Sequence, residues 1–262
     1  FMHEQLWLPL SLGLGLGLAQ LLWRRFSFTS PVFKGLVRLY YWPATGRAET
    51  VRMLLAEAGT AFEDVSFEKP TSAQVYRDAK SFMEIKSSLA AQTFFADCRA
   101  KGGNSTNNTP MLEAGGNFYT QSTAIYRLVA RFGGLYPVDP GSAYIVDNVL
   151  AHCEDMFPLC YNVLFGRGLT KEGLATEMVP LHLGNLERLL GTHGGQWFTG
   201  TFSLADVRVA DLLIHLFDRA LPGCLRPFPL LMSLVERVRT RPNIAAYFAS
   251  EQYARNDKFF AL

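Results

Sequence analysis

The sequence YWPATGRAETVRMLLAEAG, residues 41–59, joins an aromatic segment to a turn and then to a helix. Residues 36–41, which lead into this stretch and share Tyr41 with it, are rich in β-forming side chains and predict a strand. Apolar residues over 48–58 recur with the spacing of one helix face, and Gly59 marks the end of that helix. Residues 62–67 predict a second strand, so the folded part of the chain begins as a β-α-β unit.

The next part of the chain extends this unit. The sequence predicts helices over 73–86 and 89–100, then a hairpin with strands over 109–113 and 117–120. A helix over 122–131 follows, and glycines end it. The order of elements is therefore that of an α/β domain interrupted by an inserted region.

Prolines at positions 137 and 140 mark a domain boundary, after which no strand pattern occurs. The sequence predicts helices over 144–165, 171–190, 203–220, 230–239 and 244–250. Ser203 and Asp206 have the spacing of a capping box, and the apolar residues that follow predict a buried central helix. The C-terminal half is expected to be all-helical.

Composition excludes several classes of function. The 262 residues carry a net charge of only +2 and show no dense basic patch, so nucleic acid is not an expected partner. The four cysteines form no C-x-x-C pair and lack metal-ligand spacing with the five histidines. We expect no metal and interpret the cysteines as buried, reduced packing residues.

The N-terminus contains an uncharged apolar segment, Leu6–Trp23, with a tryptophan near each end. About 20 apolar residues suffice to cross a bilayer, so a single transmembrane helix is expected. Arginines follow at positions 24 and 25, so the positive-inside rule predicts that the folded domain lies on the positive-inside side of the membrane. The membrane is expected to be that of an organelle, either a mitochondrion or a plastid. A signal peptide, a transit peptide and a core helix are the alternatives. Residues 1–35 are thus predicted to be an anchor and linker.

Four segments resemble the cytosolic glutathione transferases, in particular the tyrosine-type, sigma-like classes. They are YWPATGRAETVRMLLAEAG, TPMLEAGGNFYTQSTAIYRLVARFGGLYP, FSLADVRVADLLI and RVRTRPNIAAYFAS, and the resemblance covers residues 37–250. It implies a thioredoxin-like α/β domain over 36–136, with an insertion at about 69–108, and an all-α domain over 137–262. The expected fold is therefore glutathione-transferase-like, preceded by the transmembrane helix.

The resemblance implies that Tyr41 is the catalytic residue. A free thiol has a pKa of about 8.5, and a hydroxyl at the end of a strand can donate to sulfur and favour the thiolate. Arg47, at the start of the helix, would supply positive potential beside the anionic tripeptide glutathione. The alternative is that Tyr41 is a packing aromatic. Tyr40 is expected to point to the other face of the sheet, into the core.

The remaining glutathione contacts are also implied by the resemblance. Thr109 and Pro110 match the cis-proline position, where the Thr109 backbone would pair with the cysteinyl part of glutathione. Gln121 and Ser122 match the pair that holds the γ-glutamyl carboxylate, with Ser122 also expected to cap a helix. Asp155 matches an acid that reaches the γ-glutamyl amine across a dimer. Each of these roles has an alternative. Pro110 could be an ordinary trans proline, Ser122 could serve only as a helix cap, and Asp155 could be a solvated acid on a helix surface.

The chain departs from the family between the second strand and Pro110. Asp64 and Pro110 are 46 positions apart, a much longer connection than in the family. In the family this region supplies a partner for the glycine carboxylate of glutathione, and no such residue can be assigned here. Lys86 and Lys101 are the candidates that the sequence offers. Asn108 stands where the family has a glutamine.

Two functions follow as expectations. The first is a membrane-anchored glutathione transferase, in which glutathione, activated by Tyr41, attacks an apolar electrophile or a peroxide, with a homodimer as the expected assembly. The second is a non-catalytic or weakly active accessory subunit of a respiratory or photosynthetic membrane complex. A thiol reductase is excluded because the YWPA turn has no cysteine.

Overall fold

The structure is a computed structural model that describes residues 33, 35–66, 89–100, 108–164 and 166–257. The expected anchor over Leu6–Trp23, the expected helix over 73–86, and Lys86 and Lys101 lie outside these residues. Within the described ranges, no helix combines the length and apolar character that a membrane span requires.

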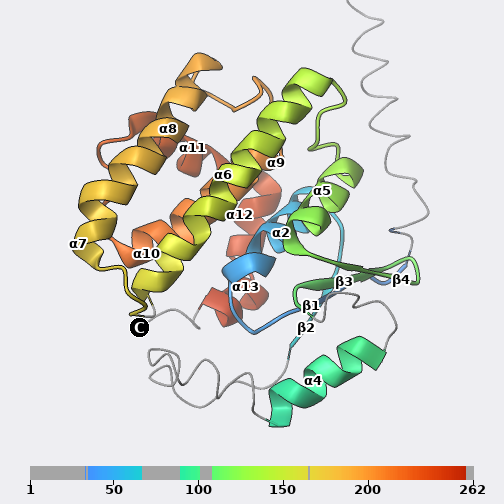
Figure 1. Cartoon of the computed structure of the whole chain (residues 1–262). Coiled ribbons are helices and arrows are strands. Elements are labelled where there is room, and N and C mark those ends of the chain that lie inside the picture. The colour runs from blue at the N-terminus through green and yellow to red at the C-terminus, as the bar shows by residue number, and fades with distance from the viewer. Residues whose placement is uncertain (1–32, 34, 67–88, 101–107, 165, 258–262) are drawn as a thin grey trace, which may run out of the picture.

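The described strands form one mixed sheet in the order β2-β1-β3-β4 (Figure 1). The strands are β1 (Arg38–Tyr40), β2 (Glu63–Val65), β3 (Met111–Ala114) and β4 (Asn117–Thr120). β1 is parallel to β2 and antiparallel to β3, which is antiparallel to β4. The parallel pair is joined through α2 (Gly46–Glu57), so the predicted β-α-β unit and hairpin are confirmed.

The two faces of the sheet carry different helices. α2 and α5 (Ser122–Phe132) lie on the face toward the helical domain, and α4 (Leu89–Ala100) lies on the opposite side (Figure 1). Side chains alternate accordingly: Leu39 and Leu112 belong to the main core, whereas Tyr40 packs with Cys98 of α4 in a separate cluster. Tyr40 is 5% exposed, which confirms its predicted inward position.

Beyond the sheet, the described elements are all helical. They are α6 (Pro140–Leu164), α7 (Lys171–Gly173), η3 (Leu174–Met178), α8 (Val179–Thr192), α9 (Leu204–Leu212), η4 (Leu213–Phe217), α10 (Asp218–Ala220), α11 (Pro229–Arg239), α12 (Pro242–Phe248) and α13 (Glu251–Asp257).

Three details of this helical domain differ from the sequence predictions. The π-helical turns η3 and η4 interrupt the helices expected over 171–190 and 203–220. α6 begins earlier than expected because Pro140 suits a first helical position and the Asp139 carboxylate accepts the Ser142 N–H at 2.8 Å. α13 was not predicted.

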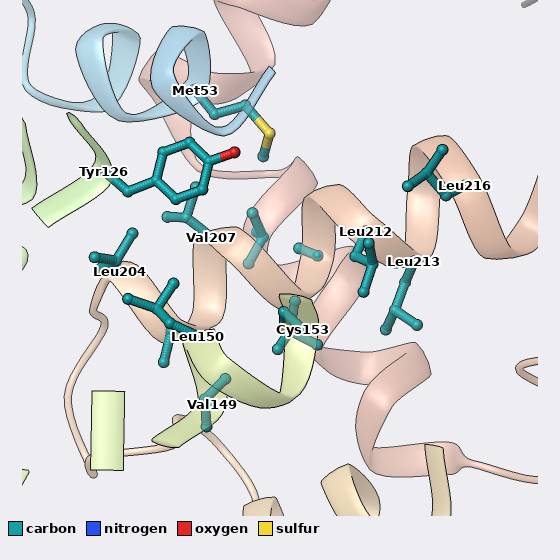
Figure 2. Packing of buried hydrophobic residues seen from close by; sticks show 14 of the residues in the cluster. Met53, Tyr126, Val149, Leu150, Cys153, Leu204, Val207, Leu212, Leu213 and Leu216 are labelled. Atoms are coloured by element: carbon teal, nitrogen blue, oxygen red, sulfur yellow. The ribbon is translucent and has the colours of Figure 1, made fainter. Parts of the chain in front are cut away.

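The central helix α9 is buried along its whole length, as predicted. Figure 2 shows it between Met53 of α2 and Tyr126 of α5 on one side and Val149, Leu150 and Cys153 of α6 on the other. Its start is fixed by the predicted capping box, in which the Asp206 carboxylate accepts the Ser203 N–H at 2.8 Å. This helix is therefore the common core element of the two domains.

The four cysteines are buried and form no disulfide, as predicted. Burial raises the pKa of the Cys153 thiol to about 12 and that of Cys224 to about 11, so both stay protonated at neutral pH. Among the described residues, no three His, Cys, Asp or Glu side chains gather in a group that could hold a metal ion.

Candidate functional site

Two neighbouring cavities lie where the sheet domain meets α6, with volumes of about 300 and 310 Å³. We define the aromatic cavity by Tyr41, Trp42, Phe95, Phe157, Pro158, Tyr161 and Asn162. We define the polar cavity by Gln121, Ser122, Thr123 and Glu154. Arg47, Asn108 and Thr109 line both. All the predicted site residues except Pro110 and Asp155 therefore line one or both cavities.

Tyr41 is held as a hydrogen-bond donor at the edge of the aromatic cavity. Its hydroxyl oxygen accepts the backbone N–H of Arg47 at 3.0 Å, which leaves the phenolic proton available to a ligand. Burial raises the pKa of Tyr41 above its ordinary value, although the Arg47 N–H and charge act in the opposite direction. The phenol is therefore protonated at neutral pH.

Gly46 permits this contact. Its φ is +52°, and a Cβ at this position would lie 2.8 Å from the Tyr41 hydroxyl oxygen. A side chain here would push Tyr41 away from the start of α2. The sequence alone gives no sign of this role, because the glycine resembles an ordinary turn residue until the Tyr41 hydroxyl is placed against it.

Arg47 is fixed through both its backbone and its side chain. Tyr126 donates its hydroxyl to the Arg47 carbonyl at 2.6 Å, and the guanidinium lies 4.2 Å from the centroid of the Phe157 ring. The guanidinium also forms an ion pair with Glu154. About a third of the side chain is exposed, so a positive charge borders both cavities.

Glu154, which was not among the predicted site residues, is the acid of α6 that lines the polar cavity. The predicted residue, Asp155, is exposed and lines neither cavity. Adjacent helix positions point about 100° apart, so only one of two consecutive acids can face the site in a given chain. The role of Asp155 across a dimer stays a prediction.

The start of α5 forms one wall of the polar cavity. Gln121 occupies the N-cap position with φ 69°, and it is the one described residue other than glycine with a positive φ. Ser122 is the first helical residue, so its predicted role as the helix cap is wrong. The strained backbone at Gln121 brings Ser122 and Thr123 to the cavity at the positive end of the helix dipole.

The Thr109–Pro110 peptide bond is cis, as predicted. However, the Thr109 N–H donates to the side-chain oxygen of Asn108 at 2.9 Å. This N–H is therefore already occupied, and only the Thr109 carbonyl remains for strand-like pairing unless the Asn108 side chain moves. The shorter residue at position 108 makes this local contact.

The inserted region contributes directly to the aromatic cavity. Phe95 of α4 meets Trp42 edge to face at 5.9 Å between ring centroids. Phe157 and Tyr161 of α6, which line the same cavity, stack at 5.7 Å between ring centroids. An apolar, planar molecule fits the chemistry of these walls. The sequence signal for Phe95 was weak, because two adjacent phenylalanines in a helix do not reveal which one faces a cavity.

Comparisons with known proteins show which proteins this chain resembles. Residues 154–251 match the family described as glutathione S-transferase, C-terminal domain. Glutathione S-transferase P of Bos taurus is 29% identical over 218 residues, covering 82% of this chain and 92% of the relative. Glutathione S-transferase P of Homo sapiens is 28% identical, covering 81% and 91%.

Solved structures show the same architecture. A Pi-class glutathione S-transferase of Onchocerca volvulus has a TM-score of 0.64 at 24% identity, covering 84% of this chain and 95% of that chain. The glutathione S-transferase from Ascaris lumbricoides has a TM-score of 0.62 at 25% identity, covering 82% and 97%. The comparisons show that this chain is similar to glutathione S-transferases over most of its length and shares their two-domain fold. Several of these relatives are P or Pi-class proteins; the sigma-like assignment stays a prediction.

Proposed function

We propose that this chain is a glutathione transferase in which Tyr41 stabilises the glutathione thiolate. The observation that carries the proposal is the geometry of Tyr41. Its oxygen accepts the Arg47 N–H, its proton is free to donate, and it borders a cavity next to a cation. A donor in this position favours the thiolate over the thiol and so lowers the pKa of the bound sulfur.

The charges of the two cavities suggest how the substrates divide between them. The γ-glutamyl part of glutathione occupies the polar cavity, where the helix start at Ser122 and the Arg47 guanidinium attract its carboxylate. The cysteinyl sulfur then lies near Tyr41, at the border of the two cavities. Glutathione as the thiol substrate fits the glutathione S-transferase relatives.

The aromatic cavity takes the second substrate, an apolar electrophile or a peroxide. The thiolate attacks its electrophilic atom, a bond to sulfur forms, and the leaving group departs with the electron pair. Phe95, Phe157 and Tyr161 bury apolar surface of this substrate and exclude water from the thiolate.

The test is calorimetric titration of the full chain with glutathione, followed by conjugation of 1-chloro-2,4-dinitrobenzene. We expect measurable binding, and weaker binding of cysteinylglycine, which has the same thiol but no γ-glutamyl group for the polar cavity. Absence of binding at millimolar glutathione would refute the enzyme proposal in favour of the accessory-subunit alternative, which requires no ligand.

Membrane attachment is a separate part of the proposal. The apolar segment Leu6–Trp23 supports it, and its test is alkaline carbonate extraction of membranes that contain the full chain. An anchored chain stays in the pellet, and release into the supernatant contradicts the anchor. Analytical ultracentrifugation in detergent tests the proposed homodimer.

A further inference from the structure

Arg208 is a buried cation in the centre of α9 that does not itself line either cavity. Its side chain is 1% exposed. One terminal nitrogen donates to Asp211 at 3.1 Å and to the Thr50 hydroxyl at 3.3 Å, and the other donates to Glu154 at 3.0 Å. A planar guanidinium can serve two carboxylates at once in this way.

Glu154 connects this buried cation to the cavity. One of its oxygens accepts from Arg208 and the other pairs with Arg47. The side chain of Glu154 is 26% exposed and lines the polar cavity, so its negative charge faces the space where an anion would bind. Two arginines thus hold one carboxylate between them.

The charges of the linked ion pairs around Glu154 balance. Arg47 and Arg208 offset Glu154 and Asp211, and Asp211 also contacts the Nδ1 atom of His215 at 2.8 Å. Burial alone would lower the pKa of Arg208, but Tyr126, Asp211 and Glu154 raise it above the ordinary value, so the cation is permanent. Without Arg208, the charge of Glu154 would be offset by Arg47 alone.

We propose that Arg208 is a positioning residue of the glutathione site, which fixes and neutralises Glu154 so that the charge of Arg47 stays available to an anionic ligand. This inference rests on the proposed function, because it needs an anion in the polar cavity. Arg208 acts through Glu154 and touches no substrate. Its removal would leave Glu154 to neutralise Arg47 and to repel the ligand carboxylate.

The experiment measures the Kd of glutathione by calorimetry for the wild type, Arg208→Met, Glu154→Gln and the double variant. We expect Arg208→Met to raise the Kd about tenfold or more, since an uncompensated charge would then face the ligand. In the double variant, which lacks both charges, we expect the Kd to return to within about threefold of the wild-type value. A residue that only stabilises the packing of α9 would show no such recovery, because a change to Glu154 at the cavity would not repair the packing of the helix.

Arg219→Met is the matched control, since Arg219 forms an ion pair with Asp257 away from both cavities. It should leave the Kd unchanged. If Arg208→Met does not fold, Glu154→Gln is compared with the double variant: with Glu154 neutral, removal of Arg208 should change the Kd less than about threefold. The inference would be overturned if folded Arg208→Met binds glutathione with the wild-type Kd, or if the double variant shows no recovery of the Kd. It would also be overturned if the Kd values of Glu154→Gln and the double variant differ by more than about threefold. A wild type that does not bind glutathione would instead refute the proposed function.

Discussion

The polar and aromatic cavities share Arg47, Asn108 and Thr109 but are built in different ways. The polar cavity relies on backbone geometry and charge: the strained residue before α5, the first turn of that helix, and a carboxylate held by two arginines. The aromatic cavity relies on ring side chains from three separate places, the end of β1, α4 and α6. The polar cavity is thus tied to the core, whereas the aromatic cavity depends partly on an inserted helix.

The largest expected effect is at the border of the two cavities. Tyr41→Phe removes the proton donor to sulfur and should lower kcat about 10²–10³-fold and raise the pKa of bound glutathione, measured by thiolate absorbance. Tyr40→Phe is the control, because the Tyr40 hydroxyl donates to Glu113 at 2.6 Å on the other face of the sheet. Equal losses in the two variants would show that Tyr41 has no special role.

Gly46→Ala tests whether the approach of α2 to Tyr41 matters. Gly59→Ala is a matched control, since its φ is +65° but an added Cβ would meet nothing within 4 Å. Each substitution should cost about 1 kcal/mol of unfolding free energy through the positive φ, and so lower Tm by about 2–4 °C. Only Gly46→Ala should also lower kcat, by about tenfold or more, because its Cβ would displace the hydroxyl. Full activity in folded Gly46→Ala would contradict this account of the Tyr41 position.

Phe95→Ala should affect the aromatic cavity alone. Loss of its wall should raise KM for an aromatic electrophile about tenfold, while the Kd of glutathione stays within about twofold. Phe94→Ala is the control, because Phe94 packs near Tyr40 at 6.4 Å between centroids and does not line the cavity. If both variants change KM equally, α4 supports the fold rather than the subsite.

The smallest effect should separate strain from binding at Gln121. Gln121→Gly relieves the positive φ and should raise Tm by about 2 °C, while loss of the side chain weakens glutathione binding severalfold. Gln121→Ala removes the same side chain but keeps the strain, so it should weaken binding equally without the gain in Tm. Differential scanning fluorimetry and calorimetry measure the two quantities. Lower Tm in Gln121→Gly than in Gln121→Ala would contradict the strain.

Much of the fold could be predicted because its signals are local. The β-α-β start, the hairpin at Gly115-Gly116, the Ser203–Asp206 capping box and the fully apolar course of α9 each depend on residues a few positions apart. The ends of elements were less predictable. The π-helical turns at 174–178 and 213–217 do not alter the apolar periodicity enough to be seen in the sequence.

The candidate site was predicted in part, for a related reason. Tyr41, Arg47, Gln121 and Ser122 belong to short motifs, and all line the cavities. Glu154 was missed because it adjoins a second acid, and only the rotation of α6 decides which acid faces the site. Asn108 was recognised as a departure, but its hydrogen bond to the Thr109 N–H depends on a backbone geometry that the sequence does not display.

The sequence by itself determined the sheet domain followed by a helical domain, the fully buried course of α9, and the placement of a tyrosine at a strand end beside a helix start. These follow from periodicity, turn chemistry and motif spacing, which act over one or two helical turns. The predicted one-sided burial of α2 was incomplete, because its polar residues Glu49 and Arg52 are buried as well. Only the tertiary structure decided that Arg208 pairs with Glu154, an acid at the cavity 54 positions before it, and that Phe95 of α4 lines one cavity with Phe157 and Tyr161 of α6. Such contacts arise from packing between elements that are distant in the chain, where orientation depends on the whole core rather than on neighbouring residues.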